Sequence, residues 1–166
     1  MLPQPQAPNG TPLDRFVHRF SRTSYALAIL LLYLVAATAL GLALAPALAV
    51  AGKLIALADR LSPLPAWALR GFALALGWFV FGLALLWVVP LYNWILPTRL
   101  HPYRGGYYTI KAVPWLLHNG LFYLVRFTFL PFATLTPQGV WFLKAMGMKI
   151  GRHAFINTEN YYVLST

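Results

Sequence analysis

The sequence predicts a mainly α-helical membrane protein with two transmembrane helices, followed by interfacial amphipathic helices and by the first one or two strands of a parallel β-helix. Hydrophobic residues make up 60% of the 166 residues and charged residues only 10%, whereas average soluble domains hold about 45–50% and about 25%. Residues 23–52 and 71–98 contain no charged side chain. Near the C-terminus, Ile150 and Ile156 are six residues apart, a spacing typical of hexapeptide β-helix repeats.

The charge balance indicates contact with lipid headgroups. Formal net charge is +10, and Asp14, Asp59 and Glu159 are the only acidic residues. Lys and Arg flank the apolar stretches, as in membrane proteins that meet anionic lipids, whereas a nucleic-acid-binding domain needs a clustered basic face. We therefore expect membrane lipids and no nucleic acid as partners. The chain has no cysteine, which excludes disulfides and thiolate sites.

The chain divides into four predicted regions. Residues 1–22 begin with a Pro-rich stretch that predicts a disordered tail. Apolar and basic residues then alternate, which is suited to a headgroup surface; the basic residues are Arg15, Arg19 and Arg22. Residues 23–98 form a two-span hairpin, since each uncharged stretch exceeds the about 20 residues that a span needs. A cleaved signal peptide is disfavoured, because its apolar region runs only about 7–15 residues.

Details of the hairpin follow from its small residues and prolines. Pro46 is expected to end or kink the first helix. Residues 54–61 are expected to form a short interfacial helix, and residues 62–65 a turn. Small residues recur every four positions, which lets a neighbouring helix approach closely, although an Ala-rich helix that faces lipid accounts for them equally well. These residues are Ala37, Gly41, Ala45 and Ala49.

Residues 99–147 are predicted to be an interfacial helical platform. Polar side chains interrupt the apolar run that follows residue 111 and fall on one side of a helix, so this run is expected to lie in the interface or to re-enter rather than to span. The residues expected at the headgroups are Arg99, Arg104, Lys111, His118 and Arg126. A second helix should start at an N-cap, Thr136, with Pro137 in its first position. Gly147 should end it with a left-handed C-cap.

Residues 148–166 are predicted to start a β-helix or to form an extended partner-binding tail. Ile150 and Ile156 would point the same way, into an apolar shaft or against the platform helices, with the chain extended from Lys149 to Tyr161. Gly151 would supply a tight corner.

The longer pattern resembles a known family. The residues that carry the resemblance are Gly105, Gly106, Tyr107, Tyr108, Trp115, Thr136, Pro137 and the run from Leu143 to Ile156. Over roughly residues 98–158 the chain is similar to membrane-anchored hexapeptide-repeat acyltransferases with a left-handed β-helix, as in the terminal domain of poly-lysine-synthase-type nonribosomal peptide synthetases. The coils that would carry an acyl-transfer histidine are absent here, so the resemblance implies an anchor and assigns no catalytic residue.

The sequence contains no recognisable catalytic or metal-binding motif. None of the four histidines is followed five residues later by Asp, and three dispersed acids offer no converging metal ligands. We therefore expect no catalytic site, metal or cofactor. The chain is then either the membrane anchor of an acyltransferase-like protein, active only if further coils follow, or a non-enzymatic accessory subunit of a larger membrane complex, such as an energy-transducing or photosynthetic one.

The basic residues also predict an orientation in the membrane. Two spans put both termini on one side, and Lys and Arg are most abundant after the second span. By the positive-inside rule that side is the cytoplasm. We expect a protein of the inner membrane with both termini cytoplasmic.

Overall fold

The structure is a computed structural model that describes residues 21–96, 98, 112–151, 154 and 156. Its helices, in chain order, are α2 (Ser21–Ala58), α3 (Pro63–Ile95), α4 (Val113–Arg126), α5 (Leu130–Ala133) and α6 (Pro137–Ala145). The described residues contain no strand. The mainly helical fold is therefore confirmed, whereas most of the predicted β-helix start lies outside the described residues.

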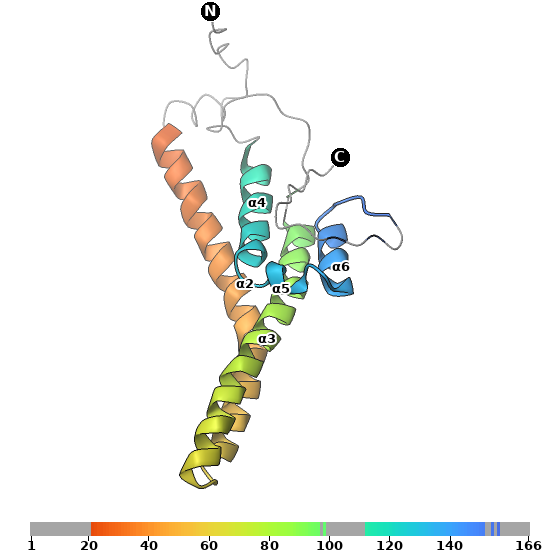
Figure 1. The fold of residues 1–166 in the computed structure, drawn as a ribbon. Coiled ribbons are helices and arrows are strands. Elements are labelled where there is room, and N and C mark those ends of the chain that lie inside the picture. Colours follow the sequence, from red (N-terminus) through yellow and green to blue (C-terminus); the bar gives the residue numbers. More distant parts are fainter. Residues whose placement is uncertain (1–20, 97, 99–111, 152–153, 155, 157–166) are drawn as a thin grey trace, which may run out of the picture.

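Helices α2 and α3 form a long antiparallel hairpin whose arms lie close together near the connecting turn and diverge toward their other ends (Figure 1). Both are long and apolar enough to cross a membrane. With 38 and 33 residues they measure about 57 and about 50 Å at about 1.5 Å per residue. Each helix therefore exceeds the about 30 Å of a hydrocarbon core.

A seam of small residues brings the two arms together. Its buried members on α2 recur every four residues and are Ala39, Ala43, Ala47 and Ala51. On α3, Gly77 lies against this seam, because a Cβ there would stand 3.3 Å from the Ala51 Cβ. The stripe predicted from the sequence is two positions away and is exposed along its whole length: Ala37, Gly41, Ala45 and Ala49. It is not the face that packs within this hairpin.

The turn of the hairpin differs from the sequence-based expectation in two respects. Helix α2 continues past Pro46 to Ala58, so the separate interfacial helix at residues 54–61 is wrong. Ala51 and Ala58 are buried within the structure, and this packing extends the helix. The predicted turn at 62–65 is also wrong, because α3 already begins at Pro63. Proline fits the first turn of a helix, where backbone N–H groups have no intrahelical partner.

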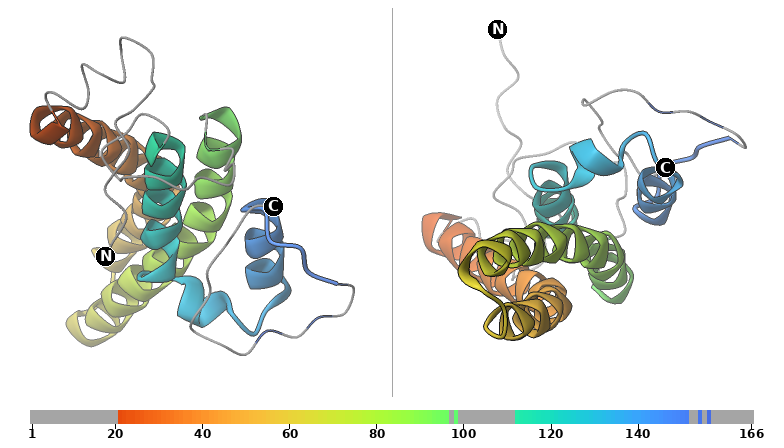
Figure 2. Two further views of the ribbon diagram at one scale, coloured as in Figure 1. Left: turned by 90° about the horizontal axis from the view of Figure 1, so that it is seen from above. Right: turned by 60° about the horizontal axis from the view of Figure 1, so that its bottom comes forward.

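Helices α4 to α6, which we call the platform, cover the end of the hairpin opposite its turn. Helix α4 packs against both arms and α6 against α3, and Figure 2 shows α4 beside the diverging arms from two further directions. The core lies where these elements meet; its fully buried large side chains include Leu85, Leu86, Leu121, Val125, Phe142 and Leu143. The prediction that residues 112–147 are helical is confirmed, although the run is broken into three helices.

Two glycines shape the corner of the platform, which we define as residues 127–136 between α4 and α6. The Phe129 ring lies directly on Gly82 of α3, so a Cβ at Gly82 would fall 1.9 Å from a ring carbon. Gly139 lies under the backbone of Ala133, whose carbonyl oxygen would stand 2.3 Å from an added Cβ. Both approaches exist only because these residues lack a side chain.

Candidate functional site

A polar side-chain pair, buried His118 and half-buried Asn93, joins α4 to α3. His118 Nδ1 and Asn93 Oδ1 are 2.8 Å apart, and only 3% of His118 is exposed. The sequence predicted His118 at the headgroups on a polar stripe, whereas the structure turns it inward toward α3. His118 shares the i, i+3, i+4, i+7 face of α4 with Leu121, Phe122 and Val125. That periodicity marks a buried helix face and is the sequence signal for its inward position.

With Asn93 Oδ1 as the acceptor, the contact assigns the ring nitrogen of His118 that carries the proton. Asn93 Oδ1 is an acceptor, so His118 Nδ1–H donates to it. The other ring nitrogen, Nε2, is buried and has no hydrogen-bond partner, which leaves it as an unprotonated acceptor. Burial lowers the pKa of His118, which lies outside the two spanning helices, below the ordinary value of 6.5. The pair therefore acts as a neutral polar link between α3 and α4.

Among the described residues, the neighbours of this pair include a threonine and apolar side chains. Thr98 is buried and its hydroxyl donates to the backbone oxygen of Asn93. Within the described ranges no group of three His, Cys, Asp or Glu residues could hold a metal ion. A general base needs a partner that orients it toward a reacting group, and Asn93 only fixes the ring in place. The hydrogen bond between the two side chains joins α3 to α4 at one defined position.

We expect the stability of the protein to depend on the titration of His118. Because the pKa is lowered in the folded state, the unfolded chain binds more protons below about pH 6.5. Stability is thus unaffected above that pH and falls below it, by up to about 1.4 kcal/mol per pH unit. In detergent, the midpoint of thermal unfolding should fall more steeply with decreasing pH for the wild type than for His118→Gln. Parallel curves for the two proteins would contradict this assignment.

Both ends of α6 are capped by residues of its own flanking segments. Thr136 caps α6 by accepting from the backbone N–H of Gly139 at 3.4 Å, and Pro137 occupies the first turn. The helix ends with Gly147 at a φ of 104°. The N–H groups of Gly147 and Met148 donate to the carbonyls of Lys144 and Leu143 at 3.0 and 2.9 Å, which is the Schellman arrangement. The predicted caps of α6 are confirmed.

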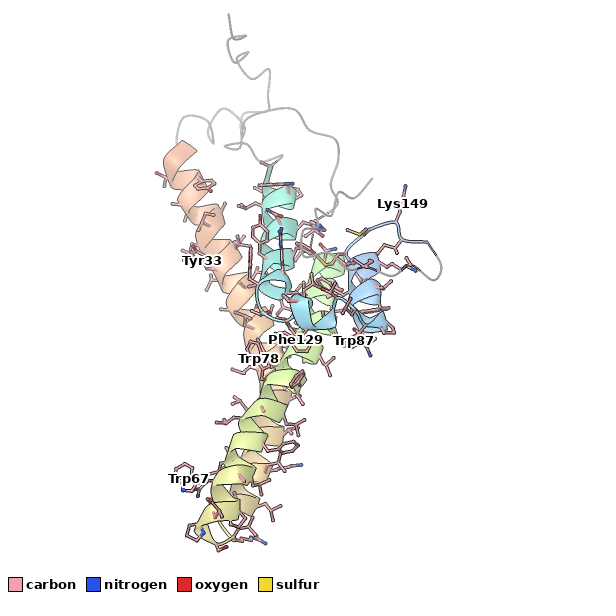
Figure 3. All side chains as sticks on the ribbon, viewed as in Figure 1. Tyr33, Trp67, Trp78, Trp87, Phe129 and Lys149 are labelled. Atoms are coloured by element: carbon pink, nitrogen blue, oxygen red, sulfur yellow. The ribbon has the colours of Figure 1, made fainter. Side chains whose placement is uncertain are left out.

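Tryptophans hold α6 against α3. The ring centroids of Trp87 and Trp141 are 4.0 Å apart, and Trp94 Nε1–H donates to the Ala145 carbonyl at 3.0 Å. The later residue of α3 contacts the later residue of α6, so the two helices run parallel to each other, away from the turn of the hairpin. Figure 3 places Trp87 and Phe129 part of the way along the hairpin, between Trp67 near its turn and Lys149 at the other end.

The chain after α6 returns onto the platform. Ile150 and Ile156 are both half-buried and both pack against the hydrophobic core. The core that they contact is built mainly from α3 and the platform helices together. The predicted β-helix face stays a prediction. Gly151 is exposed and has open space around it.

The other residues predicted at the membrane surface are only partly described. Arg126 ends α4 and lies over the rings of Tyr123 and Phe127, at 6.0 and 5.5 Å from their centroids. Most of the others lie outside the described residues: Arg15, Arg19, Arg99, Arg104 and Lys111; for Arg22 only the helical backbone is described. Their predicted contact with headgroups stays a prediction.

Comparison with known proteins assigns no family and no function to this chain. No protein-family model matches the chain, and the comparisons with curated proteins and with solved structures gave no significant match. Two features of the described residues bear on function: the long apolar hairpin, and the core against which Ile150 and Ile156 pack.

Proposed function

We propose that this chain is an integral membrane anchor that holds its own C-terminal segment at a fixed position on the platform. The observation that carries the proposal is the packing of Ile150 and Ile156 against the same core. An anchor with a free linker would leave such residues in water, whereas two half-buried isoleucines at different points restrict both the position and the direction of the segment. The hairpin supplies the membrane part, with two helices of spanning length.

The finer form of this proposal is the anchor of a hexapeptide-repeat acyltransferase-like protein. The six-residue interval between the isoleucines supports it, because equivalent side chains of a β-helix face recur at that interval. The platform would then be the surface on which the first coil rests. These residues themselves would carry no catalytic site, and acyl transfer would belong to further coils.

A second candidate is a non-enzymatic accessory subunit that docks to other membrane proteins. It is favoured by the outer face of α2, where the small residues Ala37, Gly41, Ala45 and Ala49 are all exposed. A helix from another subunit can approach closely along such a face, and Gly41 has no atom within 4 Å of the place of a Cβ. Under this proposal the C-terminal segment would be a contact site for the host complex.

Motion of the C-terminal segment tests the anchor proposal. The chain has no cysteine, so a nitroxide on Ala154→Cys would be its only label. In reconstituted bilayers we expect restricted motion of this label, and mobile spectra once Ile150→Asp and Ile156→Asp place unpaired charges in an apolar site. Lys149→Asp is the matched control, because Lys149 is exposed and its replacement should leave the label restricted.

Two results would count against the anchor. The label could already be mobile in the otherwise unchanged protein, or the two isoleucine substitutions could leave its spectrum as it was. Circular dichroism of each variant shows whether the helices are retained, so that a mobile segment is distinguished from a protein that has lost its fold.

A further inference from the structure

Helix α3 contacts the platform at known positions along its length, so these contacts show how deep in the membrane each part of the platform lies. Arg70 is near the turn of the hairpin, and no charged residue follows it on α3 up to Ile95. Gly82 is 12 residues beyond Arg70, about 18 Å along the helix, and Trp94 is 24 residues beyond it, about 36 Å. With one edge of a hydrocarbon core of about 30 Å at Arg70, Trp94 stands just past the opposite edge. Tryptophan is enriched at that level.

The corner of the platform reaches down to the acyl chains on this scale. Phe129 lies on Gly82, and Phe132 meets Phe79 edge-on with ring centroids 6.4 Å apart. The outward side chains of the corner are apolar, since Phe127 is 73% exposed and Phe132 is 60% exposed. These contacts place the corner about half-way between the two edges, well below the headgroups.

The threonine hydroxyls of the corner form hydrogen bonds within the protein, as polar groups in a hydrocarbon environment must. The hydroxyls of Thr128, Thr134 and Thr136 donate to backbone carbonyls one turn or less before them, so none of these donors requires water. The guanidinium of Arg126 lies over the rings of both Tyr123 and Phe127, 6.0 and 5.5 Å from their centroids, so aromatic faces cover part of its charge.

Beside α6 lies a partly open hollow of about 370 Å³. Its lower wall is apolar and includes Leu135, Pro137 and Val140, and Ala154 and Ile156 of the C-terminal segment close another side. At its upper end is Lys144, the one charged residue among the described lining residues. Lys144 precedes Ala145, whose carbonyl accepts a hydrogen bond from Trp94, so the backbone of Lys144 lies at the level of Trp94, next to the headgroup region.

We propose that this hollow is a binding site for an anionic phospholipid, with the phosphate on Lys144 and one acyl chain along Val140 and Leu135. Taking about 30 Å³ for each water-sized group, the volume holds about twelve methylene groups. The Thr134 and Thr136 hydroxyls already donate elsewhere and Pro137 has no N–H, which disfavours a sugar or a nucleotide that needs several donors. Among the described lining residues, one cation stands above apolar side chains, which matches the two parts of a lipid.

Lipid retained by the purified protein tests the site. We expect native mass spectrometry in detergent to show phosphatidylglycerol bound more tightly than phosphatidylcholine, and Lys144→Gln to weaken phosphatidylglycerol binding about tenfold, as the loss of one charge-assisted contact. Lys149→Gln, which removes an exposed lysine outside the hollow, should bind as the wild type does. Val140→Trp should exclude both lipids, whereas Leu74→Trp on the exposed side of α3 should exclude neither.

Each other outcome overturns the proposal. Equal losses in Lys144→Gln and Lys149→Gln would mean that lipid is held by overall charge. Displacement of the lipid by millimolar inorganic phosphate would identify a simple anion site without a chain channel. Retention of lipid by Val140→Trp with an unchanged unfolding midpoint would exclude the hollow. The proposal rests on the membrane placement of the hairpin. The C-terminal segment lines only one side of the hollow, so lipid binding that depends on Lys144 and Val140 in a protein with a mobile spin label would separate the two proposals.

Discussion

Replacing Gly139 with alanine is expected to destabilise the protein at the upper end of the about 1–3 kcal/mol that overpacking typically costs. The added Cβ would stand 2.3 Å from the Ala133 carbonyl oxygen and 2.8 Å from its carbon. These atoms belong to the backbone and cannot rotate away, so the corner must shift against α6. Thermal unfolding of the purified variant in detergent, followed by loss of helical circular dichroism, measures the effect.

Gly41→Ala is the matched control for this substitution. It makes the same chemical change inside a helix, at a position where nothing lies within 4 Å of the new Cβ. Because alanine favours helix over glycine by up to about 1 kcal/mol, we expect Gly41→Ala to be neutral or stabilising. A Gly139→Ala variant that is as stable as Gly41→Ala would show that the corner is looser than described.

Replacing Gly82 with alanine is expected to be comparably damaging, but for a reason that a second substitution can reverse. The new Cβ would fall 1.9 Å from a carbon of the Phe129 ring, and that ring is buried in the core. Phe129→Ala alone should lose about 3–5 kcal/mol through the cavity it leaves. In the double variant the Cβ enters space that the ring has vacated, so Gly82→Ala should add little further loss.

The double-mutant cycle gives this coupling directly. Measured by the same unfolding assay, the interaction between residues 82 and 129 should be of the order of 1–3 kcal/mol, as for side chains in contact. Gly71→Ala, also on α3 but with open space around it, should show no coupling to Phe129→Ala. Additive losses for Gly82→Ala and Phe129→Ala would mean that the ring does not rest on Gly82.

Sequence reasoning succeeded where structure depends on local chemistry. The start and end of α6 follow from the hydroxyl of Thr136, the ring of Pro137 and the freedom of Gly147, and all three act within a few residues of their own position. The two apolar helices likewise follow from length and composition. Such features require no knowledge of what lies across the interface.

The sequence did not reveal which face of a helix is buried when two faces carry similar side chains. Along α2 the residues at 39, 43, 47 and 51 are as small as those at 37, 41, 45 and 49, and only the position of α3 decides which set is buried. The prediction for His118 is wrong because a polar side chain does not always lie on the outer face of a helix. Asn93 on α3, distant in sequence, satisfies the imidazole in the interior instead, and no local pattern reveals that partner.

The alanine seam between α2 and α3 has a consequence for the register of the hairpin. Ala39, Ala43, Ala47 and Ala51 repeat every four residues. A slide of α2 by four residues, about 6 Å at about 1.5 Å per residue, would therefore place each alanine where another one had been. Small, uniform side chains therefore do not encode a unique alignment. It is fixed by the short connection between Ala58 and Pro63, which has no slack for such a slide, and by the Phe129 ring seated on Gly82. A longer connection would no longer prevent the slide. The register of α2 against α3 would then depend on the contact between Phe129 and Gly82 alone.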